Sequence, residues 1–120
     1  MKHLLLTAIA AVLLVGCGPS EAELALMDAA IDGNIEAVKQ HLAAGTKVDA
    51  IMGFDGRTPL LGAVRKGHKE IAEMLIDRNP DMNALDNNGD TPLDLASGKT
   101  ADLLRKHGGK TAEELKAQGK

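Results

Sequence analysis

Aromatic side chains are almost absent from this 120-residue chain, which contains one Phe and neither Trp nor Tyr. Proteins that bind nucleic acid commonly combine a basic surface with aromatic side chains on which bases stack. Here the formal net charge is −3, and no cluster of Lys and Arg is interleaved with aromatic residues. The composition therefore argues against nucleic acid as a partner.

The residue groupings that enzymes and metal sites need are also lacking. His41, His68 and His107 have no metal-site spacing and no cluster of cysteines beside them. Residues 53–56 include two glycines but lack the Lys and Ser or Thr that follow in a phosphate-binding loop. Residues 81–90 are rich in Asp and Asn without the EF-hand spacing, so turn formation explains them better than calcium binding. We expect a protein that is not an enzyme, with no catalytic residue, metal, cofactor or small-molecule substrate.

The first sixteen residues are typical of an export signal that is removed from the mature protein. Lys2 and His3 precede an apolar run from Leu4 to Val15, which as a helix would span about 18 Å, too short for a bilayer core of about 30 Å. Leu14-Val15-Gly16-Cys17 resembles the lipobox of bacterial lipoproteins. The resemblance implies that Cys17 is lipidated and becomes the new N-terminus. The alternative is an ordinary secretory signal followed by an unpaired cysteine.

A lipid is also the expected means of membrane attachment. Cys17 is the only cysteine and can form no internal disulfide. Loss of Lys2 with the signal leaves 13 Lys and Arg (14 − 1) against 17 Asp and Glu, a net charge near −4 that does not favour binding to anionic lipid. Position 18 is Gly rather than Asp, which under the enterobacterial sorting rule favours the outer membrane. We expect a lipid-anchored protein of the bacterial cell envelope, on the periplasmic side of the outer membrane.

One helix, turn and helix are predicted in residues 58–83. Thr58-Pro59 forms a helix start, Gly67 ends the first helix, and the second helix is expected from near Lys69 to Arg78. A shift of 34 residues aligns residues 26–50 with this unit, and a shift of 33 repeats its start signal at 89–93. A short helical hairpin cannot bury its apolar face alone, so the sequence predicts stacked repeats.

The stretch GRTPLLGAVRKGHKEIAEMLIDRNPDMNALDNNGDTPLDLA resembles ankyrin repeats, and the resemblance covers roughly residues 20–108. Thr58-Pro59-Leu60 and Gly67-His68 match motifs of that family, and His68 is expected to make a structural hydrogen bond at its turn. Leu61 and Asp94 stand where the family usually has His, which should weaken hydrogen bonding at those helix starts. The resemblance implies an all-α ankyrin-repeat solenoid, in which helix-turn-helix units carry β-hairpin fingers.

Local signals place the remaining boundaries. Ser20 with Glu23, and Thr111 with Glu114, form capping boxes at the starts of the first and last helices. Helical spacing directs four side chains of the first helix inward: Leu24, Met27, Ala30 and Ile31. The third repeat lacks about one helical turn, which predicts a single turn at 92–96, a linker at 97–99 and a helix at 101–107. The predicted organisation is a signal peptide at 1–16, a tether at 17–19, two full repeats at 20–52 and 53–86, a degenerate third repeat at 87–109, and a C-terminal capping helix and tail at 110–120.

The resemblance also implies a protein partner and marks contact positions for it. They lie on the first finger (residues 49–57), on the second finger (residues 83–90) and at the end of the helix between them: Phe54, Asp55, Arg57, Arg65, Lys66, Asn87, Asn88 and Asp90, with Ile31 and Asp32 as first-repeat equivalents. Solvation alone is the alternative for the charged side chains, and packing under its own finger is the alternative for Phe54. Two other functions stay open: a purely structural envelope lipoprotein without a specific partner, and an inhibitor or immunity-type protein against a secreted enzyme.

Overall fold

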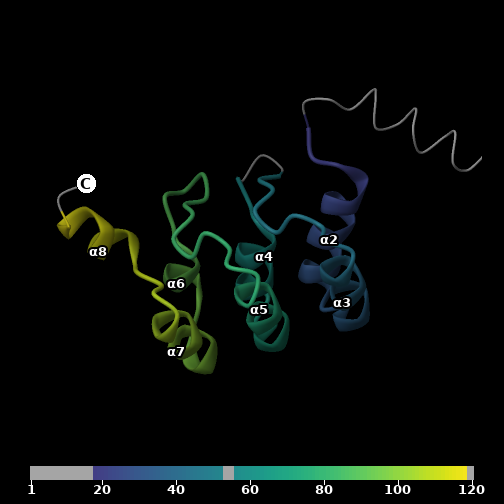
Figure 1. Ribbon diagram of the computed structural model, residues 1–120. Coiled ribbons are helices and arrows are strands. Elements are labelled where there is room, and N and C mark those ends of the chain that lie inside the picture. Colours follow the sequence, from purple (N-terminus) through teal and green to yellow (C-terminus); the bar gives the residue numbers. More distant parts are fainter. Residues whose placement is uncertain (1–17, 53–55, 119–120) are drawn as a thin grey trace, which may run out of the picture.

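A computed structural model describes residues 18–52 and 56–118 of the chain. In this part three helical hairpins stand side by side, α2 with α3, α4 with α5 and α6 with α7, and α8 follows them (Figure 1). The arrangement confirms the expected all-α solenoid. The helices are α2 (Glu21–Asp32), α3 (Ile35–Ala43), α4 (Pro59–Arg65), α5 (Lys69–Ile76), α6 (Pro92–Leu95), α7 (Gly98–Lys106) and α8 (Ala112–Ala117).

Helices α2, α4 and α8 begin where side-chain caps were predicted. The Ser20 hydroxyl accepts the Glu23 N–H at 3.2 Å, and the Glu23 carboxylate accepts the Ser20 N–H at 3.0 Å. This backbone hydrogen bond from Ser20 is the main cause of the lowered pKa of Glu23. The Thr58 hydroxyl also caps a helix, α4, by accepting the Leu61 N–H at 3.2 Å. Each cap satisfies an N–H that has no partner inside the helix.

Two predicted boundaries are wrong by two or three residues. Helix α5 ends at Ile76 rather than near Arg78, because the chain tightens into successive three-residue turns and Asn79 adopts a φ of 55°. Helix α7 begins at Gly98 rather than Ala101, so the predicted linker at 97–99 is shorter than expected. The helix shortened in the third repeat is therefore α6, which is a single turn of four residues.

The core runs through all three hairpins. Its largest fully buried side chains include Leu26, Leu60, Ile71, Leu75 and Leu104. Leu24 was predicted to face inward but is 46% exposed. Helix α2 packs mainly against α3 and α4.

A histidine connects the first two hairpins. The His68 ring nitrogen Nε2 lies 3.1 Å from the carbonyl oxygen of Ile31, across the boundary between the repeats. Gly33 makes room for this ring, because a Cβ atom at that position would lie 2.7 Å from His68 Cε1. Gly33 also ends α2 with a φ of 79°, a backbone conformation that suits glycine. The structural role predicted for His68 is therefore confirmed.

Candidate partner-binding surface

The first finger is closed at its base by a short backbone pairing. Met52 donates its N–H to the Arg57 carbonyl at 2.8 Å and accepts the Arg57 N–H at 3.0 Å, an isolated antiparallel bridge. Among the described residues of the finger, the expected β-hairpin is reduced to this single bridge. Phe54 and Asp55 lie outside the described residues, as does Cys17 with the whole lipobox.

Arg57 occupies the base of the first finger and is half-buried. Its aliphatic stem lies along α4, since a Cβ atom built on Gly62 would be 3.7 Å from Arg57 Cδ. The side chain therefore packs on its own repeat as well as facing solvent. The sequence showed only its position on the finger, and this packing role was not predicted.

The second finger is shaped by one buried carboxylate. Asp86 is 8% exposed, and its Oδ1 accepts the N–H groups of Asn88 and Asp90, each at 2.9 Å. Its own N–H donates to the Asp90 carbonyl at 3.0 Å, and its carbonyl accepts the Gly89 N–H at 3.0 Å. An Asp followed two residues later by Asn is a turn signal, and these bonds support the turn interpretation of the stretch. The role of Asp86 itself was missed.

The finger carries its exposed side chains on this closed turn. Asn87 and Asn88 are exposed, and Asp90 is half-buried. The backbone groups near them are already hydrogen-bonded to Asp86, so little loop ordering would be needed on binding. The second finger therefore presents amide side chains from a preformed support.

The two fingers lie against each other. A Cβ atom on Gly56 would be 2.6 Å from Asn87 Oδ1, so the base of the first finger touches the side of the second. Arg65 and Lys66 are exposed at the other end of α4, whose seven residues span about 10 Å. The structure thus brings the base of the first finger together with the second finger but sets Arg65 and Lys66 apart from them. The equivalent contact positions in the first repeat are Ile31 and Asp32. Asp32 is exposed, and the carbonyl oxygen of Ile31 lies 3.1 Å from the His68 ring nitrogen.

Metal-ligating side chains do not cluster in the part of the chain that the structure describes. No group of three or more His, Cys, Asp or Glu among them could hold a metal ion. The three carboxyl groups with a shifted pKa, Glu23, Asp94 and Glu114, all belong to capping boxes, where the pKa is lowered by hydrogen bonds. In the ranges 18–52 and 56–118, none of the helices has the length and apolar character needed to span a bilayer.

Asp94 fastens the C-terminal helix to the third repeat. Its Oδ2 accepts the Thr91 N–H at 2.9 Å and the Ala112 N–H at 3.0 Å, and the Thr91 hydroxyl donates to the Lys110 carbonyl at 2.6 Å. The expectation that Asp94 weakens hydrogen bonding at this helix start is therefore wrong, because the carboxylate caps both α6 and α8. Burial raises the pKa of Asp94, but the hydrogen bonds from Thr91 and Ala112 outweigh it and the pKa is lowered.

Asp94→Ala is expected to lower the free energy of unfolding by about 1 to 2 kcal/mol near neutral pH, the usual cost of losing a cap. The folded-state pKa of Asp94 lies below its ordinary value, so its stabilisation is present above that value and is lost as pH falls through the folded pKa. Urea unfolding followed by circular dichroism should show a smaller acid-induced loss for Asp94→Ala than for the wild type. Glu113→Ala, on the exposed face of α8, is the control. Equal acid sensitivity of Asp94→Ala and the wild type would contradict this role.

Comparison with known proteins identifies the same repeat architecture. A family model described as "Ankyrin repeats (3 copies)" matches residues 26–113. An ankyrin repeat-containing protein of Schizosaccharomyces pombe, P1E11.10, is 38% identical over 65 residues, which cover 54% of this chain and 31% of that protein. Protein phosphatase 1 regulatory subunit 27 of Mus musculus is 35% identical over 80 residues, covering 67% of this chain and 51% of that protein. Palmitoyltransferase ZDHHC13 of Homo sapiens is 32% identical over 68 residues, covering 57% of this chain and 11% of that protein. The chain thus spans about half, or less, of the length of these relatives.

Proposed function

The chain belongs to the ankyrin-repeat family, which makes it a protein–protein interaction module, and we propose that it recognises a protein partner in the bacterial cell envelope while held to the membrane by a lipid on Cys17. The partner meets the two fingers and the neighbouring helix surface. The protein binds and does not turn over a substrate. One relative is named as a regulatory subunit of a phosphatase, which supports an adaptor role over an enzymatic one.

The observation that carries the proposal is the joined pair of fingers. Asp86 holds the second finger in one turn, and Gly56 lets the first finger pack against Asn87. Exposed amide side chains on such a rigid support can bind without a large entropic cost. A surface that only solvates the protein has no need of this preformed arrangement.

The proposed anchor places the module close to the membrane. Helix α2 begins at Glu21, with Ser20 as its cap, so only Gly18 and Pro19 separate Cys17 from the folded part. An extended stretch of three residues reaches about 10 Å. The fingers are then held within a few tens of ångströms of the bilayer, at about 1.5 Å per helical residue. The partner's docking site should lie at a similar height.

Affinity capture from crosslinked membranes tests the proposal. The tagged full chain should enrich one partner reproducibly, and a variant with Asn87→Ala and Asn88→Ala should enrich it less at equal abundance. Gln40→Ala, on the exposed surface of α3 at the far side from the fingers, should capture as much as the wild type (Figure 1). A diffuse set of proteins that is the same for all three chains would favour the purely structural alternative. An inhibitor of a secreted enzyme would appear as the special case in which the partner is that enzyme.

A further inference from the structure

The connection from the third repeat to the next helix, α8, is too short to form a finger. Fourteen residues connect α3 to the cap of α4 (44–57), and fourteen connect α5 to the cap of α6 (77–90), but only four connect α7 to the cap of α8 (107–110). The caps themselves are alike: Thr58, Thr91 and Thr111 all have extended backbones, with ψ of 164°, 167° and 162°. Helix α8 therefore begins as α4 and α6 do, and the long loop that precedes both of them is missing in front of it.

The missing loop leaves one side of the second finger uncovered. Within the protein, the second finger covers the base of the first, because Asn87 Oδ1 would lie 2.6 Å from a Cβ atom on Gly56. Gly89 is the equivalent of Gly56 one repeat later and has the same left-handed backbone, with φ of 81° against 70°. Apart from its chain neighbours, no described residue has an atom within 4 Å of a Cβ atom built on Gly89. The side of the second finger that would receive a third finger is open.

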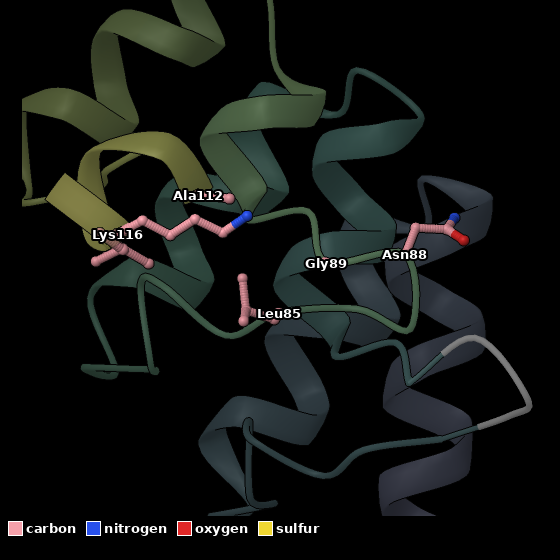
Figure 2. Close-up of a pocket in the computed structure, with 6 residues that line it drawn as sticks. Leu85, Asn88, Gly89, Ala112 and Lys116 are labelled. Atoms are coloured by element: carbon pink, nitrogen blue, oxygen red, sulfur yellow. The ribbon is translucent and has the colours of Figure 1, made fainter. Parts of the chain in front are cut away.

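A groove occupies this place. It has a volume of about 460 Å³ and lies between the second finger and α8; we call it the end groove, and its lining residues are Leu85, Asn88, Gly89, Ala112, Leu115 and Lys116. Leu85 is 54% exposed here, although it is a large apolar side chain. Figure 2 shows Lys116 reaching from α8 toward the finger that carries Leu85 and Gly89. The volume falls within the range of about 300 to 1,000 Å³ that is typical of ligand sites.

Charge favours an acidic occupant at this end of the molecule. Residues 98–118 contain five Lys and Arg and three Asp and Glu, which gives a net charge of +2. Residues 18–97 contain seven Lys and Arg and fourteen Asp and Glu, which gives a net charge of −7. Lys116 is the charged residue in the lining of the end groove. Complementary charge guides encounter and fixes the orientation of a bound segment.

We propose that the end groove binds an extended, acidic and aliphatic segment of the partner protein in the place of the missing finger. An aliphatic side chain of this segment packs between Leu85 and Leu115, a carboxylate pairs with Lys116, and a polar side chain lies over Gly89 as Asn87 lies over Gly56. This inference rests on the proposed function, since it names the part of the partner that the module binds. It adds a contact site at the C-terminal end that the predicted finger residues do not include, apart from Asn88.

A second copy of the chain fits this place less well. Its first finger lies between α3 and α4 in the chain, and α2 packs directly against α4. Setting that finger beside Gly89 in the register of the repeats would put its α4 on α8, and its α2 and α3 on α6 and α7. A segment free of such helices avoids this overlap.

The test uses a probe taken from the protein itself. A fluorescent peptide copying residues 83–90, NALDNNGD, supplies an aliphatic side chain, carboxylates and the amide that covers Gly56. Titration with the full chain in detergent should give saturable binding. Gly89→Asn should weaken it at least tenfold by filling the groove, because Asn tolerates the left-handed backbone. Lys116→Glu should weaken it to a similar extent, and Lys116→Arg should restore it.

Matched variants separate groove binding from general effects. Gly45→Asn adds the same side chain at another glycine with a left-handed backbone and open space around it, and Lys99→Glu reverses an exposed charge outside the groove. Both should bind the peptide within twofold of the wild type. No binding by the wild type, or equal binding by all variants, would overturn the inference. So would a dimer of the full chain that Gly89→Asn disperses, since a second copy would then fill the groove.

Affinity capture distinguishes this inference from the proposed function. If the wild type and Gly45→Asn enrich a partner and Gly89→Asn does not, the proposed function and the role of the end groove are both supported. If Gly89→Asn and Lys116→Glu capture the partner as well as the wild type does, the end groove is not the partner's site and the proposed function survives. If no chain enriches a partner, the proposed function fails.

Discussion

Leu75→Ala is expected to unfold most molecules of this protein at room temperature. Leu75 is fully buried in α5, and this helix belongs to the middle hairpin and packs against both α3 and α7. Replacing a buried Leu by Ala typically costs about 2 to 5 kcal/mol, because transfer free energy is lost and a cavity is left. A solenoid of about three repeats has few interfaces between repeats to compensate, so its stability should be small to begin with.

Thermal and urea unfolding, followed by circular dichroism, measure this effect. Leu24→Ala is the matched control, because Leu24 is the same residue type on α2 but is 46% exposed. Its effect should remain well under about 1 kcal/mol, as for most exposed positions. If the melting curve of Leu75→Ala moved no further than that of Leu24→Ala, the buried face of the middle hairpin would not be the one that holds the solenoid together.

Cys17→Ala is expected to abolish membrane attachment completely. The chain contains a single cysteine, so incorporation of radioactive palmitate into the wild-type protein reports on one position. The wild type should be labelled and should sediment with membranes, whereas Cys17→Ala should be unlabelled and should not sediment. Ser20→Ala, three residues further on, should behave as the wild type does, because it removes a helix cap and leaves the thiol in place. An unlabelled or fully soluble wild type would remove the lipoprotein proposal.

Features set by a few adjacent residues could be predicted from the sequence. The starts of α2, α4 and α8 follow from Ser20, Thr58 and Thr111, since the hydroxyl of each accepts an N–H three residues away. The end of α2 follows from Gly33, because a left-handed residue at that place interrupts the helix. These interactions need no knowledge of which helices become neighbours.

Features that depend on distant neighbours could not be predicted in the same way. The capping role of Asp94 toward Ala112 appears only when α8 is placed beside α6, and the exposure of Leu24 depends on which side of α2 meets α3 and α4. The end groove depends on both the short 107–110 connection and the position of the second finger. The sequence did show the shortened third repeat, but it did not show that the loss of a finger would leave a groove beside the second finger.

Site-specific photocrosslinking in intact cells tests most directly the central claim, recognition of a partner through the fingers. A photoreactive amino acid at Asn88, exposed on the second finger, should give one discrete crosslinked species in the membrane fraction. The same amino acid at Gln40, exposed on α3, should not give that species. Absence of any species at position 88, or the same species from both positions, would contradict the claim.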